Sequence, residues 1–404
     1  MKTSHIYFAL LATAAGTALC NQGVLILSAA RLGMPEALTS TFGALVYTGF
    51  LLLPISFKAV RRFGANVGMG GHLLIMALSM LGMGGLLFFP PSGWLCLLFF
   101  TLLFLMQSMV SMSNAMFFLL QKTIPPGESL DKFISRRSYL TQGGTLAFTL
   151  VTVWYLAGHQ ETRQLSTLYW GSFFLFAVAS VFYARMGDSQ RIRDMLAQPF
   201  LPSMRQAIHF PAMRRLLPVG VIQNLAHMTL TPNCILALKS ARQATENQIV
   251  LLTSLELVTA IVAAFAYKRM VASRSPSKCM FLAYHTLPVV TLFWWLVPEG
   301  APLAAFALPL AVSGIILIFC SMAMANHFTI VIPDSLQMSG TMLVMLVHGV
   351  LTGLLGIALN SLLHQAIDAF HPATPWTHYR LFFSVFILLY FGCLYFGRRL
   401  DKRR

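Results

Sequence analysis

The stretch WLCLLFFTLLFLMQSMVSMSNAMFFLL, residues 94–120, contains no charged side chain. A helix needs roughly 20 apolar residues to cross a hydrocarbon core of about 30 Å, so this stretch is long enough to span a membrane. Similar stretches recur from one end of the 404 residues to the other. The whole chain is 57% hydrophobic and 10% charged, whereas a soluble globular chain carries roughly 25% charged residues. The composition therefore predicts a polytopic membrane protein.

Twelve apolar stretches are predicted to be membrane spans. Their limits are 6–29, 38–57, 68–89, 94–120, 138–158, 168–184, 216–237, 248–266, 279–297, 302–325, 340–362 and 380–397. We expect the first to be an uncleaved helix, because it is longer than the apolar region of a typical signal peptide and carries Asn21 and Gln22 near its end. The cysteines and histidines do not show the spacing of metal ligands, so neither a metal nor a cofactor is expected.

Lysine and arginine are distributed unevenly between the two faces that these spans define. With both termini on one side, 23 of the 28 basic residues fall on that side and 5 on the other. The positive-inside rule places the more basic side in the cytoplasm. Topology thus explains the net charge of +16 without a nucleic-acid partner. The six tryptophans fit the same orientation, since all fall at span ends on the outer face, where an interfacial belt is expected: Trp94, Trp154, Trp170, Trp294, Trp295 and Trp376.

The loops are short and contain no Asn-x-Ser/Thr sequence, which favours a prokaryotic inner membrane. We therefore expect a multi-pass protein of the inner (plasma) membrane, with both termini in the cytoplasm. It is expected to act in the lipid bilayer as a monomer.

The longest polar interval, residues 186–215, is basic and is interrupted by prolines. It divides the chain into two groups of six spans, residues 1–185 and 216–404. Two landmarks suggest that these groups repeat one another. An Ile-Pro pair follows spans four and ten at an offset of 208 residues, and a basic pair follows spans two and eight at an offset of 207.

This organisation resembles the major facilitator superfamily. The resemblance lies in the six-plus-six arrangement, the basic central cytoplasmic loop and the basic turns after spans two and eight. The family's turn between spans two and three reads Gly-x-x-x-Asp-Arg-x-Gly-Arg-Arg, and FKAVRRFGAN at 57–66 is a degenerate form of it. Arg62 and Gly64 match, whereas Arg61 replaces the acidic residue. The resemblance implies two pseudo-symmetric six-helix bundles, transport by alternating access, and a gating loop that contains Arg61, Arg62 and Gly64.

Polar side chains recur at helical spacing inside three spans. They are Thr13, Thr17 and Asn21 in span one, Gln107, Ser111 and Asn114 in span four, and Gln223, Asn224, His227 and Thr231 in span seven. In the family that the chain resembles, spans one, four, seven and ten line the substrate cavity. We therefore expect these residues to form the substrate site: Thr17, Asn21, Gln107, Ser111, Asn114, Gln223, Asn224 and Thr231. The alternative is that they hydrogen-bond between helices, as we expect for Gln142, Thr145, Thr149 and Thr152 of span five.

Glu256, in the run LTSLELVTA at 252–260, is the acidic residue that lies inside a predicted span. A carboxylate at that depth is expected to hold a proton unless it is paired. It can act as a proton-coupling group, with His227 as a second titratable residue. It can also be a fixed contact for a cationic substrate, or a structural residue bonded to a neighbouring helix.

No motif indicates an enzyme, since His-Glu-x-x-His, a phosphate-binding glycine loop and an intramembrane Asp pair are all missing, and no catalytic residue is expected. The middle of the spans holds no basic side chain to clamp a multiply anionic solute. The sequence therefore favours a secondary active transporter, a symporter or antiporter, that moves a small neutral, amphiphilic or cationic solute together with protons. An uncoupled facilitator and a non-transporting receptor or accessory protein are the alternatives, and the sequence does not distinguish import from export.

Overall fold

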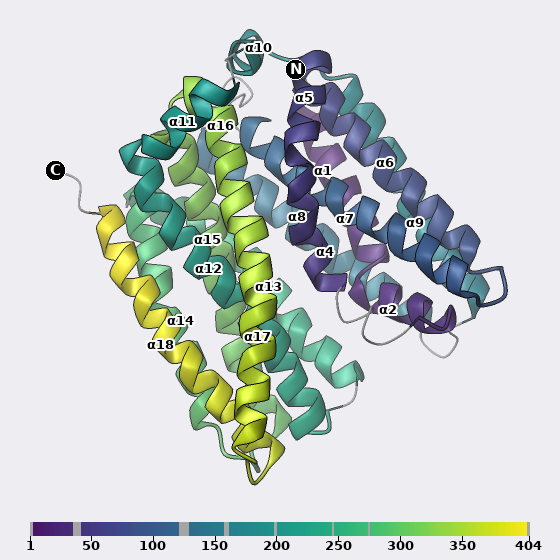
Figure 1. Cartoon of the computed structure of the whole chain (residues 1–404), viewed down its shortest axis with the longest axis vertical. Coiled ribbons are helices and arrows are strands. Elements are labelled where there is room, and N and C mark those ends of the chain that lie inside the picture. Colours follow the sequence, from purple (N-terminus) through teal and green to yellow (C-terminus); the bar gives the residue numbers. More distant parts are fainter. Residues whose placement is uncertain are drawn as a thin grey trace. The chain divides into compact units, whose positions relative to one another are not determined.

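The structure is a computed structural model. It describes residues 3–34, 42–120, 129–156, 161–197, 200–244, 246–273 and 275–401. Every regular element in these ranges is a helix or a helical turn, as Figure 1 shows. The predicted all-α class is confirmed for this part of the chain.

Helix contacts group the chain into two compact units. Unit 1 comprises Met1–Ser129, Leu140–Ser203 and Asp334–Leu346, and unit 2 comprises Leu130–Tyr139, Met204–Pro333 and Val347–Arg404. Unit 1 contains α1 (Thr3–Leu19), α2 (Gln22–Arg31), α4 (Phe42–Thr48), the 3₁₀ turn η1 (Gly49–Leu52), α5 (Leu53–Phe63), α6 (Ala65–Leu86), α7 (Gly93–Leu120), α9 (Thr162–Ala184), α10 (Gln190–Ala197) and α16 (Asp334–Met345). Unit 2 contains α12 (Pro211–Leu236), α13 (Glu246–Ser273), α14 (Pro276–Leu296), α15 (Ala307–Val331), α17 (Thr352–Ala369) and α18 (Pro375–Asp401), with the turns η2 (Ala237–Ala241) and η3 (Leu303–Phe306). The turn η4 (Leu346–Leu351) begins with Leu346 of unit 1 and continues in unit 2. The helices α8 (Leu130–Leu156) and α11 (Phe200–His209) contribute to both units.

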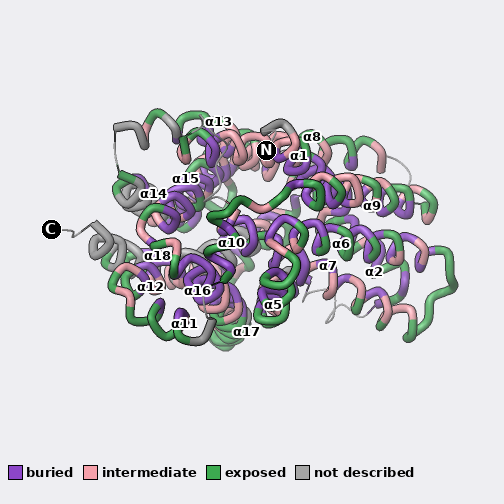
Figure 2. Tube along the Cα trace, turned by 90° about the horizontal axis from the view of Figure 1, so that it is seen from above, coloured by how far each residue is buried: buried purple, intermediate pink, exposed green. Residues whose placement is uncertain are grey.

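Five stretches of the described chain are long and apolar enough to cross a membrane. They are α6, α7, α9, the run from η3 through α15 and the run from α16 through α17, and the bent pair of α1 and α2 would add a sixth. Figure 2 shows exposed positions alternating with buried ones along α6 and α9, and the exposed ones include Leu78 and Phe174. Large apolar side chains in such positions suit contact with lipid. The chain is a multi-pass membrane protein, and the count of twelve spans stays a prediction.

The first predicted span, 6–29, is not one continuous helix. α1 ends at Leu19, α2 begins at Gln22, and the two helices are bent by 42°. Between them, the Asn21 side-chain oxygen accepts a hydrogen bond from the Val24 N–H at 3.2 Å. Asparagine is among the most favourable residues at a helix N-cap, so Asn21 begins a new helix inside the span. Discontinuous helices of this kind place helix ends within a membrane bundle.

Both units repeat the same set of helix contacts. In unit 1, α1 and α6 each pack on α9, and α7 packs on α6 and on the α4–η1 segment. In unit 2, α12 and α14 each pack on α18, and α15 packs on α14 and on α13. Taken in chain order, the helices of the first set therefore correspond to those of the second. This correspondence supports the internal repeat that the sequence offsets suggested.

One close helix crossing also recurs at the repeat spacing. A Cβ atom added to Gly49 of η1 would lie 2.5 Å from the Ser108 Cα of α7. A Cβ atom added to Gly314 of α15 would collide with the carbonyl oxygen of Glu256 in α13. Positions 49 and 256 are 207 residues apart, and positions 108 and 314 are 206 apart. Glu256 thus occupies the counterpart of Gly49, and the glycine that allows the close approach lies on the opposite helix.

The predicted gating residues lie where α5 meets α6, with Arg61 and Arg62 in the last turn of α5 and Gly64 between the two helices, and a carboxylate holds this junction. Gly64 has a φ of 99°, a conformation that glycine adopts readily and other residues rarely do. The Asp188 carboxylate, in the segment after α9, accepts the Ala65 N–H at 2.7 Å and the Asn66 N–H at 2.9 Å. The first turn of a helix cannot pair these N–H groups internally, so Asp188 caps α6.

Helix α10 ties this junction to α16 within unit 1. Arg61 donates through Nε to the Leu196 carbonyl of α10 at 3.1 Å. From the same helix, Arg191 Nε donates to the Asp334 carboxylate of α16 at 2.6 Å. This hydrogen bond raises the pKa of Arg191 above its ordinary value.

Replacing Asp188 with alanine is expected to destabilise unit 1, because the N-terminus of α6 loses its acceptor. Loss of a helix N-cap reduces the free energy of unfolding by about 0.5–2 kcal/mol. A lower melting temperature of the purified protein measures the effect. Asp194→Ala is the matched control, since Asp194 is exposed on α10 and accepts from Gln190 one turn away. Equal melting temperatures of the two variants would contradict the capping role.

Two of the tryptophans predicted for the interfacial belt are buried inside the protein. Trp154 is 77% exposed, as a belt residue would be, but Trp294 and Trp376 are each 1% exposed. Phe306 packs against both, with ring centroids 4.9 Å and 5.7 Å away. Trp376 Nε1 donates to the Val297 carbonyl at 3.0 Å, which satisfies its buried polar atom. These two rings are part of the core of unit 2.

Candidate functional site

Unit 1 contains a cavity of 400 Å³ beside the break between α1 and α2. Its polar lining comes from three predicted spans: Thr17 near the end of α1, Asn21 at the break, Gln107 of α7, and Thr145 and Thr149 of α8. The other lining residues are apolar or small, namely Ala18, Cys20, Leu25, Phe42, Val46, Met80, Met106, Val110 and Phe176. None of the described residues that line the cavity is charged. An apolar wall with a few convergent polar groups is typical of a small-molecule site.

Contacts with α9 fix the last turn of α1, which forms one wall of the cavity. The Ser172 hydroxyl donates to the Gly16 carbonyl at 2.7 Å and lies 3.2 Å from the Cys20 sulfur. Carbonyl groups in the last turn of a helix lack a partner within the helix, so this bond satisfies one of them. Gly16 packs so closely on the Phe176 ring that an added Cβ would lie 3.1 Å from it. The end of α1 is therefore held against α9 by a hydrogen bond and by close packing.

Several polar groups of the cavity remain available to a ligand. The oxygen of Asn21 is used by the Val24 N–H, which leaves its amide NH₂ to donate. Thr17 donates to the Thr13 carbonyl at 2.9 Å, so its hydroxyl oxygen can accept. Gln107, Thr145 and Thr149 line the cavity without a side-chain hydrogen bond to any other described residue. The cavity thus offers amide and hydroxyl groups, which can both donate and accept.

The N-terminus of α2 borders the cavity, because Asn21 and Leu25 both line it. A helix N-terminus carries a partial positive charge from its aligned peptide dipoles. That charge favours an electron-rich group of a ligand, such as a hydroxyl or carbonyl oxygen.

The structure brings together three of the predicted substrate residues, Thr17, Asn21 and Gln107. Ser111 lies elsewhere, since it is buried and donates to the Val46 carbonyl of α4. Asn114 is exposed on the next turn of α7. The prediction for span seven concerns side chains that lie outside the described residues, although their backbone belongs to α12: Gln223, Asn224, His227 and Thr231.

The sequence interpretation assigned Thr145 and Thr149 to helix contacts, whereas the structure places them in the cavity. Thr152 of the same stripe fits the interpretation, because it is buried and donates to the Phe148 carbonyl at 2.9 Å. Thr145 and Thr149 are four residues apart, the same spacing as Thr17 and Asn21 in span one. This shared spacing is the sequence feature that could have identified Thr145 and Thr149 as residues of the cavity.

Glu256 lies half-buried on α13 at the close crossing with α15. One turn along, the Thr259 hydroxyl donates to the Ala311 carbonyl of α15 at 2.7 Å, which pins the two helices together. Among the described residues, no basic side chain forms an ion pair with the Glu256 carboxylate. The sequence suggests His227 as a second titratable residue beside Glu256. The His227 side chain lies outside the described residues.

The gating-loop residues form a separate group within unit 1. Besides the Arg61 bond to α10 and the left-handed Gly64, the Arg62 guanidinium lies 5.5 Å from the centroid of the Phe63 ring and is exposed. Arg61, Arg62 and Gly64 also line an open pocket of 590 Å³ together with Asp188. These residues shape a turn and do not border the cavity described above.

Comparison with known proteins identifies the fold. No protein-family model and no curated protein matches the sequence. Among solved structures, a bacterial homologue of the iron transporter ferroportin in an outward-facing state matches with a TM-score of 0.74 at 14% identity, over 99% of each chain. The proton:xylose symporter XylE matches with a TM-score of 0.76 at 10% identity, over 99% of this chain and 96% of that one. The human organic anion transporter MFSD10 matches with a TM-score of 0.66 at 12% identity, over 98% of each. The chain therefore has the fold of the major facilitator superfamily.

Proposed function

We propose that the chain is a secondary active transporter of the inner (plasma) membrane that moves a small neutral, amphiphilic or cationic solute by alternating access. In this proposal the halves are residues 1–185 and 216–404, each with six spans, the loop 186–215 is cytoplasmic, and both termini are cytoplasmic. The observation that carries the proposal is the uncharged 400 Å³ cavity beside the broken first span. A scaffold has no need of such a cavity with unsatisfied amide and hydroxyl groups.

The cavity lining supports the solute class. Multiply anionic solutes such as phosphate esters need cationic clamps, and the described lining has none. Amides and hydroxyls recognise neutral polar groups, while Met80, Met106 and Phe176 provide apolar surface for an amphiphile. The cationic class is proposed because Glu256, a carboxylate inside a predicted span, is the counter-charge that the sequence offers for it.

Proton coupling is proposed at Glu256, with His227 as a second candidate. A carboxylate without a basic partner in a membrane helix is neutral in one step of the cycle and can release its proton in another, when water reaches it. The crossing with α15 holds the backbone of Glu256 in place, so helix movements would change the surroundings of the side chain. Symport and antiport both fit this site.

A thermal-shift screen of the purified protein tests the proposed solute class. The panel contains neutral sugars and polyols, amphiphiles, organic cations and, as the group expected to fail, sugar phosphates. A ligand at about 100 times its Kd stabilises the folded state by about 2.7 kcal/mol. Gln107→Ala is expected to weaken a hit roughly fivefold, the equivalent of one hydrogen bond. Thr101→Ala is the control on the same helix, because Thr101 is exposed and its hydroxyl donates to the Leu97 carbonyl one turn earlier in α7.

The outcomes of the screen separate the alternatives. Stabilisation that is stronger at low pH indicates that solute and proton bind together, as in symport. Stabilisation that is stronger at high pH indicates competition, as in antiport. A hit without pH dependence would favour an uncoupled facilitator. A sugar phosphate as the best hit, or equal effects of Gln107→Ala and Thr101→Ala, would contradict the proposed cavity.

A further inference from the structure

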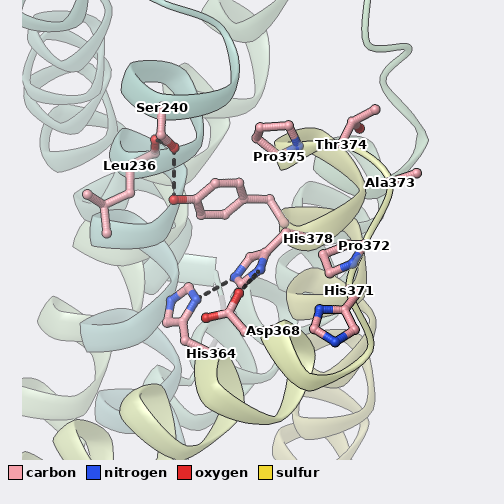
Figure 3. Close-up of a pocket in the computed structure, with 11 residues that line it drawn as sticks. Leu236, Ser240, His364, Asp368, His371, Pro372, Ala373, Thr374, Pro375 and His378 are labelled. Atoms are coloured by element: carbon pink, nitrogen blue, oxygen red, sulfur yellow. Dashed lines mark hydrogen bonds and ion pairs between the residues drawn. The ribbon is translucent and has the colours of Figure 1, made fainter.

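A second, larger pocket of 780 Å³ lies in unit 2, at the ends of α12, α17 and α18. It shares no residue with the proposed solute cavity. Figure 3 shows His364 and Asp368 of α17 and His378 of α18 pointing toward one another in this pocket. The sequence interpretation did not single out any of the three.

These side chains form a continuous line of hydrogen bonds that begins at two asparagines. Asn233 of α12 donates through Nδ2 to the Asn360 Oδ1 of α17 at 2.8 Å, which orients the Asn233 oxygen toward His364. That oxygen lies 2.8 Å from His364 Nε2. His364 Nδ1 lies 2.7 Å from His378 Nε2, and His378 Nδ1 lies 3.0 Å from an oxygen of Asp368. The line therefore joins α12, α17 and α18.

The hydrogen bonds along this line require three N–H hydrogens on the two histidines, whereas two neutral histidines supply only two. An amide oxygen can only accept, so His364 Nε2 must carry a hydrogen. An ionised carboxylate can only accept, so His378 Nδ1 must carry one too. The contact between the two rings requires a third hydrogen between its nitrogens. Each neutral imidazole carries a single N–H, so the complete line contains one imidazolium.

The geometry of the two rings fits such a shared proton. Their planes differ by 13° and their centroids are 4.9 Å apart, so the rings lie almost in one plane with the two nitrogens facing. On its face, His364 stacks on Phe382 at 4.8 Å and 22°. Phe382 is fully buried and keeps water from that side of the pair. The face of an aromatic ring also attracts a cation at this distance.

The surroundings provide a negative partner for the imidazolium. Near the pocket, the charged or titratable groups on the packed elements include Cys234, Lys239, Arg242, Glu299, Asp368, His371, Tyr379 and Arg380. Asp368 contacts His378 directly. Several of the others have partners elsewhere: Arg380 donates to the Val297 carbonyl, Glu299 accepts from Thr374, and Ser240 donates to the Tyr379 hydroxyl.

Exposure along the line gives it a direction. The Asp368 side chain is 69% exposed, whereas that of His378 is 13% exposed. At the inner end, Asn233 is buried. Water therefore reaches the line from the Asp368 end, and the two imidazoles lie between that end and Asn233 of α12.

We infer that His364, His378 and Asp368 form a proton-binding site in which the two imidazoles share one proton beyond their neutral state. The bound proton completes the hydrogen bonds that hold the ends of α12, α17 and α18 together, and its loss removes one of them. The role of this site in coupling rests on the proposed function, but the presence of the proton does not.

Nitrogen-15 NMR of the full chain, labelled at histidine and reconstituted in lipid nanodiscs, tests the site. We expect wild type to show an imidazolium signal at pH 7.5 that Asp368→Asn lacks, because an asparagine amide can donate to His378 and the line then closes with two protons. His371→Asn is the matched control and is expected to keep the signal. His371 lines the same pocket outside the line of bonds, and its φ of 46° is one that asparagine tolerates. If Asp368→Asn does not fold, His378→Gln serves in its place with the same expected loss.

Wild type without the imidazolium signal, or a variant at Asp368 that retains it, would overturn the inference. So would loss of the signal in His371→Asn. The measurement is independent of transport. A present signal combined with transport that ignores pH would refute proton coupling while leaving the site intact, and an absent signal would refute the site whatever the transport assay shows.

Discussion

The Glu256→Gln variant is expected to bind and exchange its solute but to lose proton-driven accumulation. Glutamine has the shape of a protonated glutamate, yet it has no proton to release. A pH difference of one unit is worth about 1.4 kcal/mol per proton, which sustains roughly a tenfold solute gradient. With such a pH gradient across proteoliposomes, wild type is expected to approach that ratio for a hit from the thermal-shift screen. The variant is expected to stop at equal concentrations on both sides.

Counterflow exchange without a pH gradient distinguishes lost coupling from lost folding, since it needs the cavity and the helix movements but no net proton transfer. Glu299→Gln is the matched control, because it makes the same chemical change at an exposed position of unit 2. Accumulation of the solute by Glu256→Gln would contradict the coupling role. Loss of both accumulation and exchange would instead assign Glu256 a structural role in the crossing with α15.

Much of the candidate site could be predicted because it depends on local patterns. Helical spacing within one span is enough to place Thr17 and Asn21 on a common face, and Gln107 is the polar residue at the matching depth of another span. The structure brings these three together in one cavity. Spacing does not reveal which polar side chains already hydrogen-bond to another helix. For that reason the sequence also predicts Ser111 as a substrate residue, although it donates to the backbone of α4.

Other features depend on contacts between distant segments and could not be derived from the sequence. To predict the break at Asn21, one would need to know that its side chain caps the N-terminus of α2. The polar stripe alone is equally compatible with one unbroken helix. The proton-binding line draws His364 and Asp368 from one helix and His378 from another, all near helix ends, where polar residues are ordinary. Capping of α6 by Asp188 joins two segments that lie more than a hundred residues apart.

Gly314→Ala is expected to be strongly destabilising, although alanine is the better helix former. The added Cβ would collide with the backbone of Glu256, which cannot move without moving α13 itself. Overpacking a tight contact costs about 1–3 kcal/mol, and separating the helices would also break the bond from Thr259 to the Ala311 carbonyl, worth about 0.5–1.5 kcal/mol. These outweigh the gain of about 0.5–1 kcal/mol in helix propensity. We expect the melting temperature and the exchange rate of the solute to fall together.

Gly143→Ala makes the same chemical change as Gly314→Ala but is expected to change the stability of the protein in the opposite direction. Gly143 lies inside α8, and a Cβ added there would meet no atom within 4 Å. Only the propensity term applies at this position, so the variant is expected to be slightly more stable than wild type. If both variants were stabilised, the backbones of α13 and α15 could separate without penalty, and Glu256 would not be held at a fixed depth. Since proton coupling at Glu256 requires that the helix movements, and not a loose side chain, control its access to water, that outcome would weaken the coupling proposal as well as the crossing.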